Sequence, residues 1–198
     1  MMKGTLAILL AATLAAAPAA AQGHHQGGAP PSAGSGSATV MVGGQAMLPT
    51  RDIVDNAARS ADHTTLVAAV QAAGLVETLK GRGPFTVFAP TNDAFAVLPQ
   101  GTVQTLLRPE NKQALTKILT YHVVPGRLTA TDLVARIRAG GGSATLRTVN
   151  GGTLVATRNG PMNVVLRDEQ GNVATISTYD VLQSKGVIHV ITKVLMPR

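Results

Sequence analysis

One stretch, Gly83 to Phe95, constrains the fold more than any other part of the sequence. It contains all three phenylalanines of a 198-residue chain in which only 3% of the residues are aromatic. Phe85 to Ala89 is apolar and rich in aromatic and β-branched residues, which predicts a short strand buried on both faces. Pro90 has no backbone N–H to donate, so we expect the strand to end there. This stretch therefore predicts a strand and a corner held by aromatic side chains.

The residues that follow this strand have the chemistry of a helix start. The hydroxyl of Thr91 can cap a helix, and Asp93 in its first turn would face the positive end of the helix dipole. Phe95 and Leu98 are three residues apart, so both can point back at the strand. Asn92 and Asp93 could instead make an adhesion contact at this corner. We expect capping to be their role.

The amino-terminal residues Met1 to Ala21 have the pattern of a secretory signal peptide. Lys3 supplies the positive charge, Leu6 to Ala17 the apolar stretch, and Ala19 to Ala21 a small-residue cleavage site. The apolar stretch is shorter than the ~20 residues that cross a bilayer comfortably. We predict cleavage after Ala21 and a secreted or periplasmic protein. The alternative is an uncleaved amino-terminal anchor.

A tether is expected between the signal peptide and the folded domain. Residues 22–47 are rich in Gly, Ser, Pro and Ala, a composition that buries too little apolar surface to offset the cost of ordering. His24 and His25 lie in this segment, and we interpret them as solvated side chains and not as metal ligands. The folded domain is then expected to cover residues 48–198.

Composition excludes several classes of function. The chain has no cysteine, which rules out disulfides, a thiolate nucleophile and cysteine-based zinc sites. Its formal net charge is +7, but the cations are scattered singly and few aromatic residues lie between them. Nucleic-acid binding is therefore not expected, because such proteins cluster charge with stacking residues. A basic surface also suits an acidic polysaccharide.

The order of the remaining patterns predicts an α+β fold. Helical periodicity and caps dominate the first half of the domain, and short apolar runs between Asn-Gly and Gly turns dominate the second half. The strands expected after the central stretch are 121–126, 145–149, 153–156, 163–166, 173–176 and 186–191. The pair 145–149 and 153–156 predicts a hairpin, because Asn150 and Gly151 lie between them.

We find no catalytic pattern in the sequence. There is no Gly-x-Ser-x-Gly nucleophile elbow and no phosphate-binding glycine loop. The carboxylates that could serve a glycosidase lie near expected turns or helix starts, where capping is the common role. No cofactor is predicted.

Three residues carry the remaining chemistry. Tyr121 and His122 fall on an expected strand, where alternation would place their side chains on opposite faces. His189 falls on another apolar strand. We interpret all three as buried and hydrogen-bonded. The alternative is that His122 and His189 meet beside a carboxylate and form a metal or ligand site.

Three stretches, in this order, resemble the motifs of the fasciclin (FAS1) domain. They are residues 85–95, the Tyr-His stretch 121–126, and the closing stretch 186–191 with Val194 to Pro197. The resemblance covers about Leu48 to Pro197. Lys185 stands where the family often has Asn, and Thr192 stands where an acidic residue is common.

The resemblance implies a wedge of β-sheets flanked by several short helices in a single domain. It also implies a non-enzymatic, exported adhesion module that binds a cell-surface protein or an acidic polysaccharide. The family-motif residues that could take part in interaction are Thr91, Asn92, Asp93, Tyr121, His122 and His189. The alternative function is a periplasmic small-ligand-binding protein or an unrecognised hydrolase.

Overall fold

The computed structural model of the chain describes residues 39–81, 83–161 and 163–198. The expected signal peptide with its cleavage after Ala21 lies outside the described residues. The same holds for residues 22–38 of the expected tether, including His24 and His25. Among the helices of the described residues, none has the length and apolarity needed to cross a membrane.

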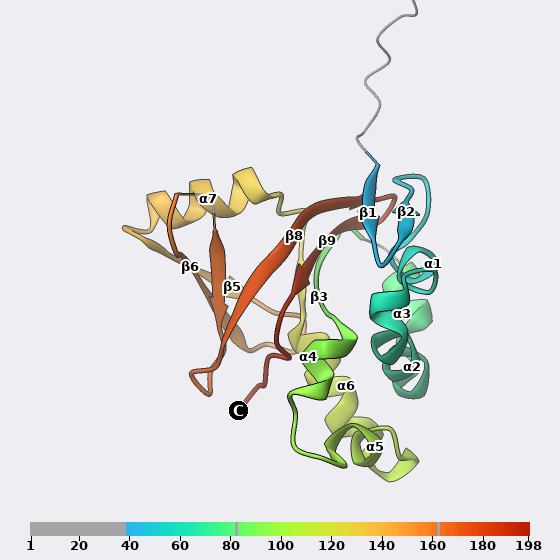
Figure 1. Cartoon of the computed structure of the whole chain (residues 1–198). Helices are drawn as coiled ribbons and strands as arrows, with labels where there is room; N and C mark the ends of the chain where they lie inside the picture. Colours follow the sequence, from blue (N-terminus) through green and yellow to red (C-terminus); the bar gives the residue numbers. More distant parts are fainter. Residues whose placement is uncertain (1–38, 82, 162) are drawn as a thin grey trace, which may run out of the picture. The chain divides into compact units, whose positions relative to one another are not determined.

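Two neighbouring parallel strands lie inside the described sheet, beside its edge strand, and we call them the central pair because both apolar cores pack on them. Strand β3 (Phe85–Pro90) pairs in parallel with β9 (Gly186–Ile191), so that Phe88 is opposite His189. The described residues form a seven-stranded sheet in the order β4-β3-β9-β8-β7-β6-β5, and its other pairings are antiparallel. The predicted buried strand and its end at Pro90 are confirmed (Figure 1).

The other strands are short, apart from one. Their bounds are β4 Val123–Pro125, β5 Ser143–Arg147, β6 Thr153–Arg158, β7 Val164–Arg167 and β8 Val173–Gln183. The predicted hairpin is present as β5 and β6, with Arg147 opposite Thr153. The sequence predicted only residues 173–176 of β8. The strand continues to Gln183 because two register shifts between Ile176 and Val181 bend it, so that its first half pairs with β7 and its second half with β9.

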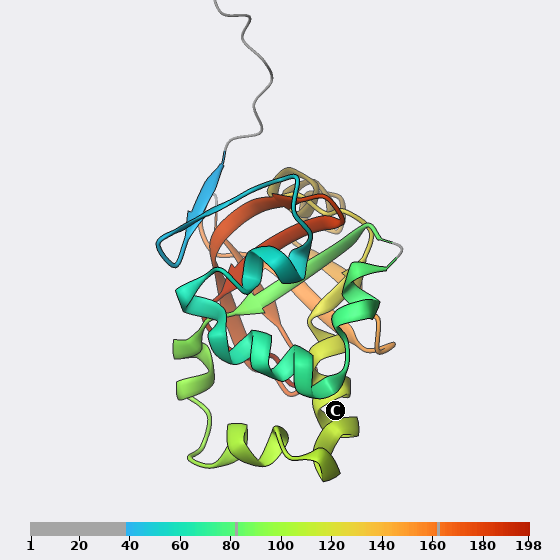
Figure 2. The ribbon, with the colours of Figure 1, turned by 90° about the vertical axis from the view of Figure 1, so that its right-hand side faces the viewer.

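The helices gather mostly beside one face of the central pair (Figures 1 and 2), and α1, α4 and α7 begin at a side-chain cap. The clearest signal is at α7, where Thr129 and Asp132 form a reciprocal capping box. The helix bounds are α1 Ile53–Ala57, α2 Thr64–Ala73, α3 Val76–Lys80, α4 Asn92–Ala96, α5 Thr102–Leu106, α6 Lys112–Tyr121 and α7 Ala130–Ala139, with 3-10 turns at Ala61–His63 and Pro109–Asn111. The predicted α+β class is confirmed.

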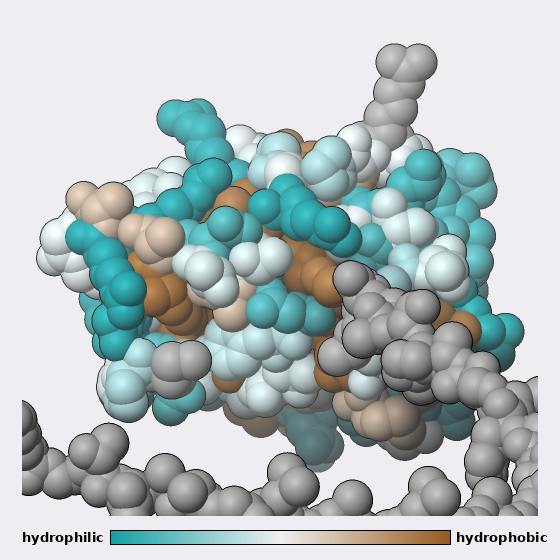
Figure 3. Space-filling view, turned by 90° about the horizontal axis from the view of Figure 1, so that it is seen from above, coloured by the Kyte–Doolittle hydropathy of each residue, from teal (hydrophilic) through white to brown (hydrophobic). Residues whose placement is uncertain are grey.

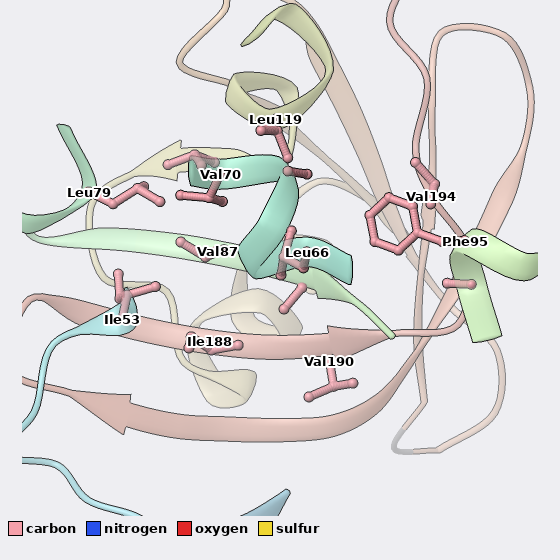
Figure 4. Packing of buried hydrophobic residues seen from close by; sticks show 14 of the residues in the cluster. Ile53, Leu66, Val70, Leu79, Val87, Phe95, Leu119, Ile188, Val190 and Val194 are labelled. Atoms are coloured by element: carbon pink, nitrogen blue, oxygen red, sulfur yellow. The ribbon is translucent and has the colours of Figure 1, made fainter. Parts of the chain in front are cut away.

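The central pair separates two apolar cores. On one face Val87, Ile188 and Val190 pack against the helices α1, α2 and α6, as Figure 4 shows for Ile53, Leu66 and neighbouring side chains. On the other face Phe88 and Ile191 pack with α7 and the inward side chains of β5 to β8. Both strands are therefore buried on both faces, which is typical of parallel pairing.

Regular structure begins earlier in the chain than the predicted boundary at Leu48. Strands β1 (Val40–Val42) and β2 (Gln45–Met47) form a separate two-stranded hairpin within the segment that we expected to be tether. Val42 and Met47 are 7% and 3% exposed and belong to the same apolar core as the helices, so the hairpin is ordered by packing on the domain. A Cβ atom on Gly43 would lie 2.6 Å from Ser60 Oγ, which shows how closely the turn packs on the domain.

A glycine substitution tests the importance of the central pair. Gly186 has a φ of 153°, and a Cβ atom there would overlap the backbone carbonyl of Phe85 on the paired strand. We expect Gly186→Ala to lower the free energy of unfolding by more than about 4 kcal/mol, measured by urea denaturation. The control is Gly171→Ala, where the Cβ has open space and only the positive φ costs about 1–2 kcal/mol. Equal losses in both variants would contradict the prediction.

Candidate functional site

Tyr121 and His122 lie at the end of a helix and not on a strand. Helix α6 runs to Tyr121, His122 is its carboxyl-terminal cap, and strand β4 begins only at Val123. The predicted strand 121–126 was therefore too long at its start. The backbone N–H of His122 donates to the carbonyl of Leu119, so helical bonding continues into the first two residues of the stretch that was predicted as a strand.

Tyr121 reaches into the core on the α7 side of the central pair, which we call the second core. Its hydroxyl joins the start of β6 to the turn after β7. Its ring is fully buried, its hydroxyl donates to the carbonyl of Thr153 at 2.6 Å, and the same oxygen accepts from the N–H of Glu169 at 3.0 Å. Burial raises the pKa of Tyr121 to about 12, so the phenol stays protonated. The hydroxyl of Tyr121 therefore has a structural role, since it both donates and accepts a hydrogen bond within the domain.

His122 is buried and uses both ring nitrogens. Its Nδ1–H donates to the carbonyl of Ile118 at 2.8 Å, and its Nε2 accepts from the N–H of Leu195 at 3.0 Å. These partners fix a neutral ring with the proton on Nδ1. Burial lowers the pKa of His122 to about 4. The ring ties the end of α6 to the carboxyl-terminal segment.

His189 is also buried but has the opposite tautomer. Its Nε2–H donates to the carbonyl of Leu128 at 2.7 Å, and its Nδ1 accepts from the N–H of Asp180 at 3.3 Å. The ring stacks on Phe88 with 5.7 Å between ring centres, and burial lowers its pKa. His122 and His189 thus serve separate backbone partners. Within residues 39–81, 83–161 and 163–198 no three His, Cys, Asp or Glu side chains are grouped so that they could hold a metal ion.

Thr91 and Asn92 cap two different helices. Thr91 Oγ1 accepts from the N–H of Ala94 at 3.3 Å and caps α4, as the sequence predicts. Asn92 Oδ1 accepts from the N–H of Thr65 at 3.0 Å, and its Nδ2 donates to the carbonyl of Ala61 at 2.8 Å. Asn92 therefore holds the start of α2, far away in the sequence. Asp93 is exposed in the first turn of α4.

The sequence did not indicate two buried polar pairs. Asn56 donates to the carbonyl of Leu48 at 2.8 Å and to Gln183 Oε1, and so joins α1 to the end of β8. Ser60 Oγ lies 2.9 Å from Nδ1 of His63, and both side chains are buried. A serine beside a histidine suggests a nucleophile with a base, but this hydroxyl is not presented to a substrate. Asn56 and Gln183 are 127 positions apart and meet only after folding, whereas Ser60 and His63 are neighbours three positions apart whose burial the sequence did not indicate.

An apolar cavity of about 90 Å³ lies between helices α1, α2, α3 and α6 and the strands β3 and β4. His122 lies on its wall, together with Thr78, Thr120 and otherwise apolar residues. His189 does not line it, and neither does any carboxylate. The sequence analysis kept as an alternative a pocket that joins His122, His189 and a carboxylate. This cavity is not that pocket. We refer to this space below as the apolar cavity.

The outward side of strands β5 to β8 consists of exposed and half-buried residues. Its residues alternate with the buried ones and carry small hydroxyl, β-branched and arginine side chains: Ser143, Thr145, Arg147, Thr153, Val155, Thr157, Val165, Arg167, Val173, Thr175 and Ser177. We call these residues the outer sheet face. Arg147 and Arg167 are its only charged members, and they form no salt bridge with any described residue.

Large exposed apolar side chains are few among the residues that the structure describes. They are Met41, Val97, Val149 and Val173, at 38–70% exposure. Seen from above, apolar side chains form separate patches between polar ones (Figure 3). On the face in this view, apolar contact is therefore dispersed.

Comparison with known proteins gives consistent matches. The family model described as "Fasciclin domain" matches residues 61–197. The chain is 51% identical over 146 residues to protein sll1483 of Synechocystis sp., covering 73% of this chain and 73% of that protein. It is 38% identical over 133 residues to the transforming growth factor-beta-induced protein ig-h3 of Sus scrofa, covering 67% of this chain but only 17% of that protein.

A solved structure has a similar fold. It is a FAS1 domain pair from the insect cell adhesion molecule fasciclin I, with a TM-score of 0.67 and 18% sequence identity. The match covers 75% of this chain and 52% of that chain, so this chain spans about half of the pair.

Substitutions of Tyr121 separate its packing from its hydrogen bonds. Tyr121→Phe leaves the Thr153 carbonyl and the Glu169 N–H without their partner, which we expect to cost about 1–3 kcal/mol. Tyr121→Ala also empties the core and should cost about 3–5 kcal/mol. Thermal and urea unfolding measure both losses. A melt of Tyr121→Ala that matches the wild type would mean that Tyr121 is exposed and free to bind.

The buried imidazole of His122 predicts a loss of stability on mild acidification. An unfolded histidine takes up a proton near pH 6.5, whereas the folded ring resists protonation until about pH 4. The unfolded state therefore binds more protons between these values, and stability falls as the pH falls. Between pH 7 and pH 5 we expect His122 alone to contribute a loss of about 2 kcal/mol.

The measurement is urea unfolding of the wild type and of His122→Gln at both pH values. The variant should lose about 2 kcal/mol less than the wild type over this interval, whatever its stability at pH 7. His63 and His189, whose pKa values are also lowered by burial, keep some of the dependence in both proteins. Identical losses in the two proteins would show that His122 is not the titrating group.

Proposed function

The chain belongs to the fasciclin domain family, and on this premise we propose that it is a non-enzymatic adhesion or surface-interaction module. In this proposal it acts outside the cytoplasm and binds protein or polysaccharide partners in the cell envelope or the extracellular matrix. The signal-peptide pattern of Met1 to Ala21 supports export. The similar fold of domains from an insect cell adhesion molecule supports adhesion.

The observation that carries the proposal is the interior position of the polar motif residues. Tyr121, His122 and His189 are buried, and each hydrogen-bonding atom of their rings has a backbone partner. A buried side chain whose hydrogen-bonding atoms already have backbone partners cannot hydrogen-bond to a partner at the surface. Recognition is therefore assigned to the exterior of the domain.

The outer sheet face is the surface that we assign to recognition. Except for Thr153 and Ser177, whose hydroxyls donate to Glu169 and to the carbonyl of Val190, its hydroxyl side chains can donate to and accept from sugar hydroxyls. Its charged members are the cations Arg147 and Arg167. The net charge of +7 adds a long-range attraction for anions. These features favour an acidic polysaccharide over a neutral one. Arginine also suits the carboxylates of such a polymer, because its planar fork pairs with them bidentately.

The experiment measures binding of the protein to alginate, a polyuronate, and to neutral dextran. We expect binding to alginate that weakens between 50 and 300 mM salt, because exposed charges are screened. The double variant Arg147→Gln with Arg167→Gln should lose about 1–2 kcal/mol, or roughly five- to thirtyfold in affinity.

A matched double variant controls for net charge. Arg59→Gln with Arg108→Gln removes the same charge from exposed positions between helices, outside the outer sheet face. We expect it to change affinity less than twofold. An equal loss of affinity in both double variants would mean that binding depends on net charge alone and not on the outer sheet face. No binding to either polymer, at any salt concentration, would remove acidic polysaccharide as the partner.

A further inference from the structure

We propose that the apolar cavity is a binding site for the end of a single linear hydrocarbon chain. This inference is independent of the outer sheet face and of adhesion. It rests on the chemistry of the walls, the size of the space and the position of its opening.

Apart from the exposed Thr78, the walls offer no free hydrogen-bond donor to a guest. The lining residues are apolar except for Thr78, Thr120 and His122. The ring nitrogens of His122 are bonded to Ile118 and Leu195, and the hydroxyl of Thr120 donates to the carbonyl of Thr116 at 2.6 Å. A cavity of this kind does not hold water well, because a buried water needs two to four polar partners. An apolar guest is favoured instead.

The volume limits the guest to a small group. The cavity measures about 90 Å³. An engineered protein cavity of ~150 Å³ with similar apolar walls holds benzene. The present space is smaller than that one, so it does not suit a six-membered ring, but it holds a few carbons of a chain. It also cannot hold two chains side by side.

The opening explains how a longer molecule can use so small a space. The deep wall is formed by buried residues such as Leu66, Val70 and Leu79, which point toward the same region as Val87 in Figure 4. Thr78 is an exposed member of the lining, and Val149 is 42% exposed. These side chains lie where the cavity meets solvent. The polar end of a guest can therefore remain in water while its first carbons enter.

The test is a titration of the protein with straight-chain alcohols from ethanol to 1-octanol. Methyl NMR reports on Val70, Leu79 and Val123 in the cavity, with Leu166 in the second core as a reference. We expect shifts confined to the cavity methyls and an affinity that rises about fourfold per added methylene until the cavity is full. Cyclohexanol should bind more weakly than 1-hexanol.

Two variants that place a larger side chain in or over the apolar cavity keep the test independent of any one substitution. Val67→Phe narrows the cavity from helix α2, and Val149→Phe covers its opening from an exposed position. Each should weaken 1-hexanol binding at least tenfold. The matched control Val173→Phe, on the outer sheet face, should change it less than twofold.

Three outcomes would overturn the proposal. One is shifts spread evenly over both cores, and another is an affinity that does not depend on chain length. The third concerns the source of the chain, which the proposal takes to be a free amphiphile. Binding to neutral phosphatidylcholine vesicles that Val67→Phe abolishes, without binding of free alcohols, would assign the site to bilayer lipid instead.

Discussion

The parallel pairing of β3 with β9 is the interaction on which the rest of the domain depends. The two strands come from distant regions of the sequence and are buried on both faces, so each of them belongs to both apolar cores. The helices α1, α2 and α6 need one face of this pair, and α7 and strands β5 to β8 need the other. Losing the pair would therefore expose both cores together, because neither has another layer to pack against.

Buried polar groups connect the elements around this pair. Tyr121, His122 and Asn92 each bond to backbone groups of segments far away in the sequence. Such groups are stabilising only when every donor and acceptor finds its partner, and an incomplete set costs more than an apolar replacement. They therefore specify one arrangement of loops and termini, and the motif residues that looked chemically active have this structural role.

The sequence was most informative where the decisive contacts are local. The strand before Pro90, the cap at Thr91 and the hairpin of β5 and β6 all follow from neighbouring residues, and each is present. The order of helical and strand patterns predicted the α+β class, and the motif resemblance extended this to the family. Two failures depend on distant contacts, because the hairpin β1–β2 is stabilised by burial against the folded domain and the continuation of β8 to Gln183 by pairing with β9. The third, the strand start predicted at Tyr121, failed because α6 continues into that stretch.

The candidate sites divide in the same way. The sequence could pick out Tyr121, His122 and His189, but it could not show which backbone groups satisfy them, since these partners lie in other segments. It also gave no sign of the apolar cavity, whose walls come from three helices, two strands and the end of α6. A space between elements has no pattern in the chain, because it depends on how tightly they pack.

The small hairpin β1–β2 gives the domain a weak point under mechanical load. Val40 lies opposite Met47, and the hairpin is held by three residue pairs in a sheet of its own. A pulling force that enters through the residues before Val40 acts at the open end of this ladder, where the pairs separate in succession. The pairs of this hairpin would therefore separate at a lower force than those between β3 and β9. The chain before residue 48 would become longer while the remaining fold stayed intact.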